Sequence, residues 1–516
     1  VKHDPFLLPD MKKAVARLKQ ARQQGEKIVI YGDYDIDGLS ATALLLDAFG
    51  KFGFENVDAF IPNRFVEGYG MTMGAVDKVR DMGADLIVTV DTGSLCHAEI
   101  AYAASLGIDT VVTDHHNVAE TPPPSVAAVN PKFSGHTYPF RDLCGAGVAF
   151  KLVQALQTEL DGLPDGYEKW LLDLVALGTV CDIVTLADEN RANVYWGLEV
   201  LKKQQRPGLK ALMAVTGIEP EQVNARHLGF GLGPRMNAAG RLETAQHALD
   251  MLVARDGLVA LEASEKLEEL NGKRRGIQDA IFEEACVQAE ELADDRVLVV
   301  SSDGWNHGVI GIVASKLVEK YKKPVFIIGE RGEEATGSAR SFGDFSAADA
   351  VRAADDIIIK GGGHGAAAGV TLATEKIGDF RRRVNGFYDS LQLTNQERYL
   401  LPRADVEIDD FSEIDEELVA NLAKMEPFGN GNPEPVLKIT RASVLSMRRM
   451  GADGQHVKLA LRDKNGKVLQ MLAFNAPEEF FREPGDEVVV WFQPTINEWQ
   501  GVRTVEGRLL HIFLLD

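Results

Sequence analysis

The chain has 516 residues, of which 45% are hydrophobic and 26% are charged; it is too long for one ordinary core and has the composition of a globular protein. Its net charge of −22 argues against a protein that coats DNA non-specifically, but it permits a local basic channel. Because we find no bilayer-length apolar run, no signal peptide and no zinc-like cysteine spacing, we expect a cytoplasmic protein without a membrane partner.

Short runs rich in β-branched residues alternate with helix-length segments over the first half of the chain. We predict buried parallel strands at residues 28–31, 86–90 and 110–113. A helix is expected directly after the first strand, at 38–49, and a more helical stretch follows Pro131. These alternations predict one α/β domain with a parallel sheet over residues 1–250.

A long segment without proline separates this domain from the next. From Leu258 to about Ala293, apolar residues recur every three or four positions with charges between them, which predicts a long amphipathic helix. We therefore expect a connecting helix within residues 251–295. Further strands at 296–300 and 324–328 predict a smaller α/β domain over residues 296–395.

The C-terminal quarter has a different character. Residues 404–420 contain eight acidic residues and no basic one. Several short strands separated by turns follow, with the expected positions 436–439, 456–461, 468–474, 487–492 and 503–505. This pattern predicts a small β-barrel over residues 404–516.

Acidic and imidazole side chains follow the three strands predicted in the first domain, and one further acid ends a run of small residues. They are Asp33, Asp35, Asp37, Asp91, Asp114, His115, His116 and Asp182. The carboxyl ends of neighbouring parallel strands meet at one crevice, where so many carboxylates would repel one another without a cation. Oxygen ligands with a few imidazoles suit Mn²⁺ or Mg²⁺, and we predict two ions.

The spacing of these residues suggests how they would share the two ions. Asp35 and Asp37 lie two positions apart, so on an extended strand end they would point the same way. We expect Asp91 to bridge both ions, with His115 and Asp182 completing the second. A single Asp before a loop or helix is more often a helix cap than a ligand, so the prediction rests on the whole set.

Three glycine-rich segments carry basic residues. They are residues 233–241, which contain Arg235 and Arg241, residues 337–341, which contain Ser338 and Arg340, and residues 361–365, which contain His364. Glycine loops let backbone amides approach an anion, and arginine binds phosphate with two parallel hydrogen bonds. Tight turns are an equally good explanation for any one segment alone. Together they favour a phosphate-containing or nucleotide substrate.

With these residues assembled, the chain resembles the DHH phosphoesterase superfamily, and within it the single-strand-specific exonucleases. The matching segments are residues 4–11, 32–38, 67–70, 114–116, 176–180, 232–242, 308–315 and 427–435. The last of these, Pro-Phe-Gly-Asn-Gly-Asn-Pro-Glu-Pro, is the most specific. The resemblance implies a DHH catalytic domain, a long helix, a DHHA1 domain and an OB-fold.

The resemblance also implies an activity and roles for individual residues. The activity is metal-dependent 5′→3′ removal of nucleotides from the free 5′ end of single-stranded DNA, in DNA repair and recombination, by a monomer that meets a helicase and a single-strand-binding protein. The implied metal ligands are Asp35, Asp37, Asp91, His115 and Asp182, with Asp33 as a further candidate. Asp114 would orient His115, and His116 would protonate the leaving oxygen. The implied phosphate-binding residues are Arg241, Ser338, Arg340 and His364, to which the glycine-rich segment adds Arg235.

One segment of the chain departs from the family's pattern, and two other functions are alternatives to the exonuclease. The family usually has His directly after Trp, whereas here Asn306 stands between Trp305 and His307, which leaves the role of an imidazole there open. A DHH hydrolase of short oligoribonucleotides, cyclic dinucleotides or pyrophosphate would share both α/β domains but would not need the barrel. A non-catalytic scaffold would not need the full set of acids and histidines.

Overall fold

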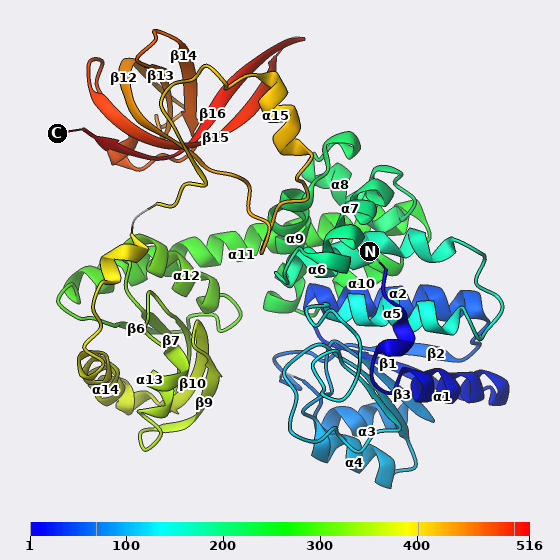
Figure 1. Ribbon diagram of the computed structural model, residues 1–516. Helices are drawn as coiled ribbons and strands as arrows, with labels where there is room; N and C mark the ends of the chain where they lie inside the picture. Colours follow the sequence, from blue (N-terminus) through cyan, green and yellow to red (C-terminus); the bar gives the residue numbers. More distant parts are fainter. Residues whose placement is uncertain (1, 69, 401, 500, 516) are drawn as a thin grey trace. The chain divides into compact units, whose positions relative to one another are not determined.

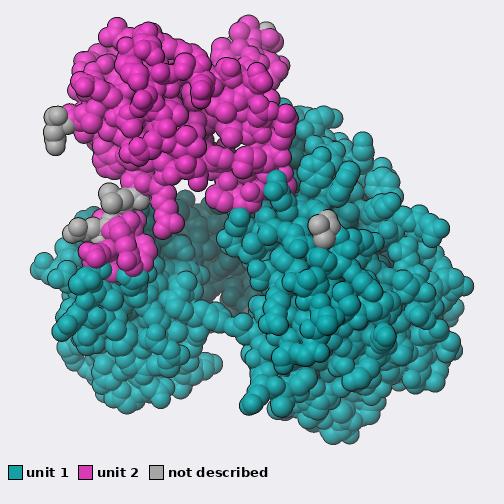
Figure 2. All heavy atoms as spheres, viewed as in Figure 1, with its two compact units in different colours: residues 1–394, 429–431 teal, residues 395–428, 432–516 magenta. Residues whose placement is uncertain are grey.

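The computed structural model describes residues 2–68, 70–400, 402–499 and 501–515. The chain forms two compact units, which Figure 2 shows in different colours. The larger unit contains residues 1–394 together with a short segment, Gly429–Gly431, and the smaller unit contains the other residues after 394. Each unit is described separately.

The first sheet of the larger unit is entirely parallel, with the strand order β2-β1-β3-β4-β5. Its strands are β1 (Ile28–Gly32), β2 (Val57–Phe60), β3 (Leu86–Val90), β4 (Asp109–Thr113) and β5 (Ala127–Val129). The three strands expected from the sequence are confirmed as β1, β3 and β4. The two that the sequence did not reveal are the edge strands, which are short.

Helices cover both faces of this sheet (Figure 1). On one face lie α1 (Met11–Gln24), α2 (Ile36–Phe52), α5 (Gly145–Leu156) and α6 (Leu172–Cys181), and on the other α3 (Met73–Asp81) and α4 (His97–Ser105). Successive residues of one strand serve different cores, since Ile28 and Ile30 pack under the first group whereas Val29 and Tyr31 pack under the second. Burial on both faces explains why the strands are continuous apolar runs.

The rest of the first domain is helical and leads into one long helix. The helices are α7 (Asp188–Lys202), α8 (Pro207–Thr216), the π-helix η4 (His227–Leu232), α9 (Gly233–Leu242), α10 (Gln246–Val253) and α11 (Gly257–Glu291). The amphipathic helix expected from Leu258 onward is therefore present. The buried side chains of Leu267 and Leu270 join the first core, and Ile281 and Ala285 join a core that includes the second sheet.

The second sheet has the order β6-β7-β8-β10-β9 and is mixed, because only β6 and β7 run parallel. Its strands are β6 (Leu298–Asp303), β7 (Val325–Arg331), β8 (Glu334–Arg340), β9 (Ile358–His364) and β10 (Ala367–Ala373). The helices α12 (Ile310–Tyr321), α13 (Ala347–Arg352) and α14 (Ile377–Ser390) pack against it. A smaller α/β domain was expected here and is confirmed.

The smaller unit is a closed barrel with one extra strand. The barrel strands are β12 (Leu437–Met450), β13 (His456–Arg462), β14 (Val468–Ala473), β15 (Glu487–Trp499) and β16 (Val502–Leu514), and β12 closes the barrel by pairing with both β13 and β15. β11 (Val406–Ile408) pairs with β12 in parallel, and α15 (Glu416–Ala423) lies between β11 and β12 in the chain. The barrel confirms the sequence prediction, but β12, β15 and β16 are 13 or 14 residues long, because polar stretches continue the pairing beyond the apolar runs. In the described residues, no helix is long and apolar enough to cross a membrane.

Candidate metal centre and phosphate pocket

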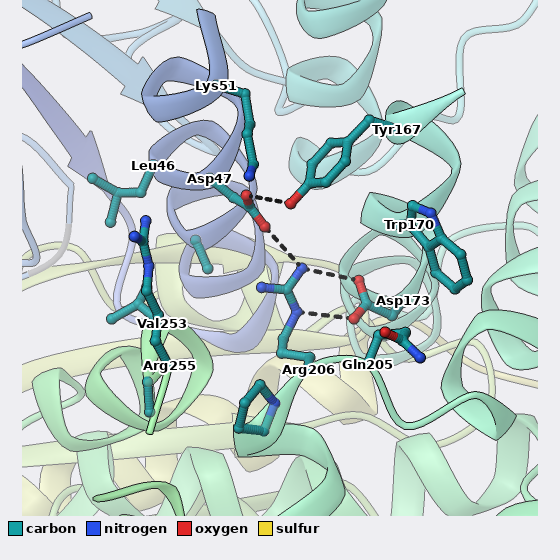
Figure 3. Close-up of a pocket in the computed structure, with 13 residues that line it drawn as sticks. Leu46, Asp47, Lys51, Tyr167, Trp170, Asp173, Gln205, Arg206, Val253 and Arg255 are labelled. Atoms are coloured by element: carbon teal, nitrogen blue, oxygen red, sulfur yellow. Dashed lines mark hydrogen bonds and ion pairs between the residues drawn. The ribbon is translucent and has the colours of Figure 1, made fainter. Parts of the chain in front are cut away.

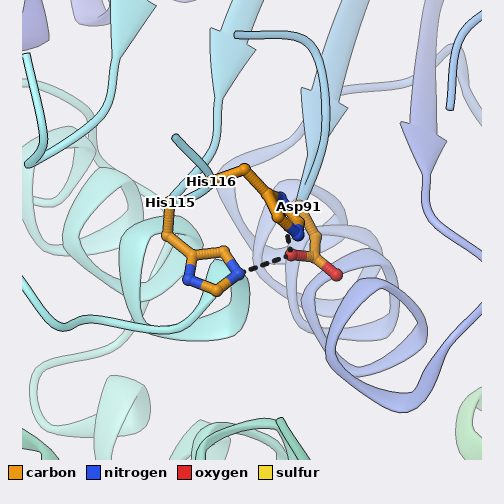
Figure 4. A group of neighbouring side chains, drawn as sticks. All are labelled: Asp91, His115 and His116. Carbon is orange, nitrogen blue, oxygen red and sulfur yellow. Dashed lines mark ion pairs between the residues drawn. The ribbon is translucent and has the colours of Figure 1, made fainter. Parts of the chain in front are cut away.

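The predicted acids and imidazoles come together beside the carboxyl ends of three adjacent strands. Asp33 follows β1, Asp91 follows β3, and His115 and His116 follow β4, while Asp182 stands at the C-terminal end of α6. Figure 4 shows both imidazole rings beside the Asp91 carboxylate, at distances of 3.0 Å from His115 Nε2 and 3.8 Å from His116 Nδ1. The cluster of acids and imidazoles expected from the strand pattern is therefore present.

The ligand atoms form three overlapping groups, each with its atoms within 4.8 Å of one another. The groups are Asp33 with Asp35 and Asp91; Asp91 with His115 and His116; and Asp37 with His115 and Asp182. Asp91 and His115 each belong to two groups. Two neighbouring cations could therefore be held in this cluster; the expected bridging by Asp91 stays a prediction.

The expected relation between Asp35 and Asp37 is wrong. The strand β1 ends at Gly32, and Asp35 is the N-cap of α2, where its carboxylate accepts hydrogen bonds from the backbone amides of Asp37 and Gly38 at 2.9 and 3.1 Å. Asp37 lies in the first helical turn. Because the chain turns into a helix between them, the two carboxylates enter different ligand groups.

The helix α5 holds the Asp37 carboxylate through two backbone amides, a contact that the sequence did not reveal. The amide of Ala146, in the first turn of α5, donates to Asp37 Oδ1 at 2.8 Å, and the amide of Gly145 donates to Oδ2. A Cβ atom at Gly145 would lie 2.6 Å from that of Asp91, and one at Gly178 would lie 2.4 Å from Asp37 Oδ1. Glycine at both positions leaves room for the carboxylates, and the amides at the helix N-terminus favour their charge.

The site contains buried polar atoms without hydrogen-bond partners among the described residues. They are both carboxylate oxygens of Asp91, Oδ1 of Asp33 and Nε2 of His115. Asp91 Oδ1 and His115 Nε2 lie 3.0 Å apart, but their geometry is not that of a hydrogen bond. Asp91 also has a φ of +61°, a left-handed conformation that is uncommon for a residue with a side chain. Unpaired buried acceptors that converge are costly in a protein, and a hard divalent cation would satisfy them. The residues present fit Mn²⁺ or Mg²⁺.

The same crowding changes the pKa values of the acids. Burial, and then repulsion from Asp35, raises the pKa of both Asp33 and Asp37 to about 7. Burial and the charges of Asp37 and Asp35 raise the pKa of Asp182 to about 8, and burial lowers the pKa of His115 to about 3. The carboxylates would have to lose protons to bind a cation, so protons and metal compete here.

This competition gives a prediction for stability. In chelator, we expect the protein to become less stable from pH 5.5 to 8.5, because carboxyls whose folded pKa is raised to 7 or 8 bind more protons in the folded than in the unfolded chain. Saturating Mn²⁺ should add about 4 kcal/mol at 1,000 times the Kd. Its effect should be largest at pH 8.5 and small at pH 5.5. Thermal unfolding measures both, and a pH-independent Mn²⁺ shift would contradict the prediction.

Asp114 contacts the ring of His116, and of His115 it contacts the backbone amide; its expected role in orienting His115 stays a prediction. Its Oδ1 lies 2.9 Å from His116 Nδ1 and accepts the backbone amide of His115 at 2.7 Å, and its Oδ2 accepts the amide of Ser94 at 2.9 Å. Burial alone would lower the pKa of His116, but the hydrogen bond and charge of Asp114 raise it to about 9. The tight turn after β4 brings residue 116 back over the carboxylate.

Three of the predicted phosphate-binding residues lie around one loop. Arg241, near the end of α9, donates to the Gly308 carbonyl at 2.8 Å, and Arg340 of β8 donates to Ser338 Oγ at 3.2 Å. A Cβ atom at Gly311 would lie 3.1 Å from Ser338 Oγ and 3.3 Å from Arg340 Nη2. Residues 308–311, where the chain enters α12, thus lie between Arg241 and the end of β8.

The electrostatics around Arg241 and Arg340 favour an anion. Burial, then the charges of Arg64, Arg274 and Arg340, lower the pKa of Arg241 to about 10. Within the described parts of the chain, neither Arg241 nor Arg340 forms an ion pair with a carboxylate. Arg64, which we did not single out from the sequence, donates to Tyr34 Oη at 3.1 Å. Tyr34 lies between Asp33 and Asp35, so Arg64 is close to the segment that carries these acids. Only the fold places Arg64 near Arg241, which lies 177 positions away in the sequence.

The other predicted residues are placed differently. His364 is exposed on β9, where it pairs with Ala367, which in turn pairs with Arg340. His364 therefore lies level with Arg340 across the sheet, and the two backbones are two strands, or about 10 Å, apart. Arg235 forms an ion pair with Glu268 of α11 and donates to the Gly231 carbonyl, so its guanidinium ties α9 to α11. His307 lies 3.1 Å from the Gly329 carbonyl, away from the metal-ligand groups.

A separate cavity of about 420 Å³ lies at the far end of α2. Figure 3 shows Arg206 at its centre, with Nε 2.9 Å from Asp173 Oδ2 and Nη2 3.4 Å from Asp47 Oδ2. Tyr167 donates to Asp47 at 2.9 Å. These charged groups satisfy one another, so the arrangement is structural.

Arg206→Ala is expected to lower the free energy of unfolding by about 3–5 kcal/mol, because it leaves Asp173 buried without its cation. Arg255→Ala, at a residue that lines the same cavity and has no ion pair in the described part of the chain, should change it by about 0.5 kcal/mol or less. Urea unfolding monitored by far-UV circular dichroism measures both. Equal stabilities of the two variants would exclude a structural role for the Arg206 ion pairs.

Three family models match the chain along most of its length. The DHH family, N-terminal domain, matches residues 27–179, the DHHA1 domain matches residues 294–389, and the RecJ OB domain matches residues 404–511. The three matches correspond to the first sheet, the second sheet and the barrel.

Full-length comparisons agree with the family models. The chain is 39% identical to the single-stranded-DNA-specific exonuclease RecJ of Bacillus subtilis, over 96% of this chain but 62% of that protein's length. It is 35% identical to the RecJ of Dickeya dadantii, over 99% of this chain and 92% of that protein. A crystal structure of RecJ from Thermus thermophilus in complex with Mn²⁺ has a TM-score of 0.83 and 31% identity, covering 99% of this chain and 72% of that one.

Proposed function

The chain belongs to the RecJ family of single-stranded-DNA-specific exonucleases, and on this premise we propose that it removes nucleotides one at a time from the 5′ end of single-stranded DNA. The observation that carries the proposal is the set of buried, unpaired ligand atoms on Asp33, Asp91 and His115 at the strand ends. A set of this kind suits a phosphodiester hydrolase that requires Mn²⁺ or Mg²⁺. We place its action in DNA repair and recombination.

We propose that two ligand groups divide the metal binding between them. Asp33, Asp35 and Asp91 would hold one cation, and Asp37, His115 and Asp182 would hold the other, with Asp91 between them. When bound, such a pair of cations activates water and stabilises charge on the phosphoryl group. The amides of Gly145 and Ala146 would keep the Asp37 carboxylate in place while substrate enters and product leaves.

His116 has the properties of a general acid. Its Nδ1 is paired with the buried Asp114 carboxylate, which favours the charged imidazolium and fixes the ring. Its side chain is 40% exposed, so Nε2 can reach a substrate at the mouth of the site. We infer that His116 donates a proton to the oxygen that leaves phosphorus, and that Asp114 is the positioning residue for this step.

End specificity would follow from the arginine pocket. Arg241 and Arg340 carry charges that lack carboxylate partners among the described residues, and Ser338 adds a hydroxyl donor. We propose that they bind the terminal 5′ phosphate, with Arg64 assisting. A phosphate held there would place the first internucleotide linkage toward the metal ligands, and an internal stretch of DNA could not fill the pocket.

Arg340→Ala is expected to lower kcat/KM on 5′-phosphorylated DNA by about 10- to 100-fold, the loss of a charge-assisted contact. On 5′-hydroxyl DNA the change should be small. Arg331→Ala, at the exposed end of β7 in the same sheet, is the matched control and should leave both substrates unaffected. An unchanged preference for phosphorylated ends in Arg340→Ala would refute the pocket assignment.

We propose that the four segments expected from the sequence divide this function. Residues 1–250 would hold the metal centre, 251–295 would connect the domains, 296–395 would supply phosphate-binding residues, and 404–516 would bind single-stranded nucleic acid through the barrel. A monomeric state, a cytoplasmic location and contacts with a helicase and a single-strand-binding protein are further proposals. Light scattering tests the first, and affinity capture from cells tests the contacts.

The decisive experiment uses single-stranded DNA labelled at the 5′ or 3′ end, with duplex DNA and RNA as controls, in Mn²⁺, Mg²⁺ or chelator. We expect immediate release of a labelled mononucleotide from the 5′ end, only with metal and only from single strands. Hydrolysis of a dinucleotide or pyrophosphate without cleavage of DNA would favour the small-substrate alternative. Binding of DNA without any cleavage would favour the scaffold.

A further inference from the structure

Three residues from the sequence of the smaller unit belong structurally to the larger one. Gly429, Asn430 and Gly431 pack with the catalytic unit, whereas Phe428 and Asn432 on either side belong to the barrel unit. The segment is therefore part of the larger unit. Its position in the catalytic unit is beside residues 183–186, the loop that directly follows the predicted metal ligand Asp182.

Asn430 holds this loop by two hydrogen bonds. Its side-chain Nδ2 donates to the Ile183 carbonyl at 2.7 Å, and its own carbonyl accepts the Leu186 amide at 2.7 Å. One residue thus contacts both ends of the loop. From the other side, Asn190 Nδ2 donates to the Thr185 carbonyl at 3.0 Å.

The two glycines allow this close approach. A Cβ atom at Gly429 would lie 2.6 Å from Leu186 Cδ1, and one at Gly431 would lie 2.5 Å from Thr185 Cγ2. Gly431 also has a φ of +74°, which residues with side chains rarely adopt. The contact therefore depends on glycine at both flanking positions, and it is a close backbone fit.

The loop that Asn430 holds is strained where it leaves the metal centre. Ile183 has a φ of +57°, although a β-branched residue strongly disfavours the left-handed region, and its side chain is exposed. Apolar burial of the Ile183 side chain therefore cannot hold this backbone. Such strain persists only where surrounding contacts impose it, and the bond from Asn430 to the Ile183 carbonyl is one of them.

We propose that Asn430 is a positioning residue for the second cation site, acting through the backbone of Ile183 to hold the Asp182 carboxylate beside Asp37 and His115. The proposal rests on the metal-dependent function proposed above. Without the side-chain amide, Ile183 can relax to negative φ, and the rotation carries the adjoining Asp182 away from the other two ligands. The other group, Asp33 with Asp35 and Asp91, does not include this loop and should be unaffected.

The test is a Mn²⁺ titration of the full chain by calorimetry and electron paramagnetic resonance, comparing wild type with Asn430→Asp and Asn430→Ala. Asn430→Asp keeps the size of the side chain but removes the donor. We expect one Mn²⁺ site to weaken by about 10- to 100-fold, as for other residues that orient a ligand, and the other to stay within about twofold. The Mn²⁺ concentration for half-maximal cleavage should rise, while kcat at saturating Mn²⁺ stays within about threefold.

Asn432→Ala is the matched control, because the Asn432 amide donates to the Met425 and Pro427 carbonyls within its own segment. It should leave both Mn²⁺ sites unchanged. Unchanged Mn²⁺ affinities in Asn430→Asp, or an equal weakening by Asn432→Ala, would overturn the proposal. Wild-type protein that binds two Mn²⁺ ions but cleaves no DNA would refute the proposed function and leave this inference standing.

Discussion

Asp91→Ala is expected to lower exonuclease activity by about 10³-fold or more, while affinity for single-stranded DNA changes little. Asp91 belongs to two of the three ligand groups, and both of its carboxylate oxygens lack hydrogen-bond partners among the described residues. A ligand placed between two cations supports both, so its loss should remove several kcal/mol of transition-state stabilisation. The phosphate-binding arginines are untouched, so DNA should still bind.

The loss of activity in Asp91→Ala should not result from unfolding of the variant. Burial, and then the charges of Asp37, Asp35 and Asp33, raise the pKa of Asp91 well above its usual range, so in chelator this carboxyl is a source of repulsion. The Asp91→Ala variant should therefore unfold in chelator at pH 8.5 at a temperature no lower than that of wild type. It should also lose most of the stabilisation by Mn²⁺.

Labelled-DNA cleavage, filter binding and thermal unfolding test Asp91→Ala together. Asp81→Ala, at the exposed C-terminal end of α3, is the matched control and should behave as wild type in all three. Undiminished cleavage by Asp91→Ala would exclude the two-ion assignment. Loss of DNA binding together with cleavage would mean that Asp91 acts in substrate binding.

His116→Ala is expected to lower cleavage of natural DNA by about 10²- to 10⁴-fold, the usual range for a general acid. The loss should be much smaller for a phosphodiester with a nitrophenolate leaving group, which departs without a proton. A residue that only shapes the site or binds metal would affect both substrates alike. The ratio of the two losses therefore isolates proton donation.

Steady-state kinetics with both substrates test His116→Ala at saturating Mn²⁺. His247→Ala is the control, because His247 lies on the surface of α10, where it contacts only Glu243 among the ion pairs of the described chain. Asp114→Asn should reproduce part of the His116→Ala defect, since the amide cannot stabilise a charged imidazole as well. Equal losses of activity on both substrates would show that His116 is not the general acid.

Some features of the molecule follow from local sequence. The runs at 28–31, 86–90 and 110–113 contain enough β-branched and apolar residues to form strands whatever surrounds them, and burial on two faces leaves no polar alternation. Parallel strands bring their carboxyl ends to one edge, so an acid just after each run must lie near the others. The long helix after Leu258 likewise follows from a segment without proline in which most apolar residues recur every three or four positions.

The details of the centre depend on contacts between distant segments. The sequence could not reveal that Asp35 caps a helix while Asp37 meets the amides of Gly145 and Ala146, 108 and 109 positions away. Nor could it reveal that Asp114 accepts only the backbone amide of His115 while it contacts the ring of His116, because the turn after β4 decides which group reaches the carboxylate. A residue type specifies which atoms can bind, but their partners are set by packing.

Local patterns in the chain were enough to predict the three central strands of the first sheet, the long helix, the barrel and the acids and imidazoles at the strand ends. Only the tertiary structure decided which acids share a ligand group, that Arg235 is paired with Glu268 while Arg64 stands near Arg241, and that Asn430 holds the loop after Asp182. The contacts of Arg235 with Glu268 and of Asn430 with Ile183 join residues 33 and 247 positions apart. Hydrogen bonds and charge interactions act over a few ångströms in space, and separation along the chain carries no record of them.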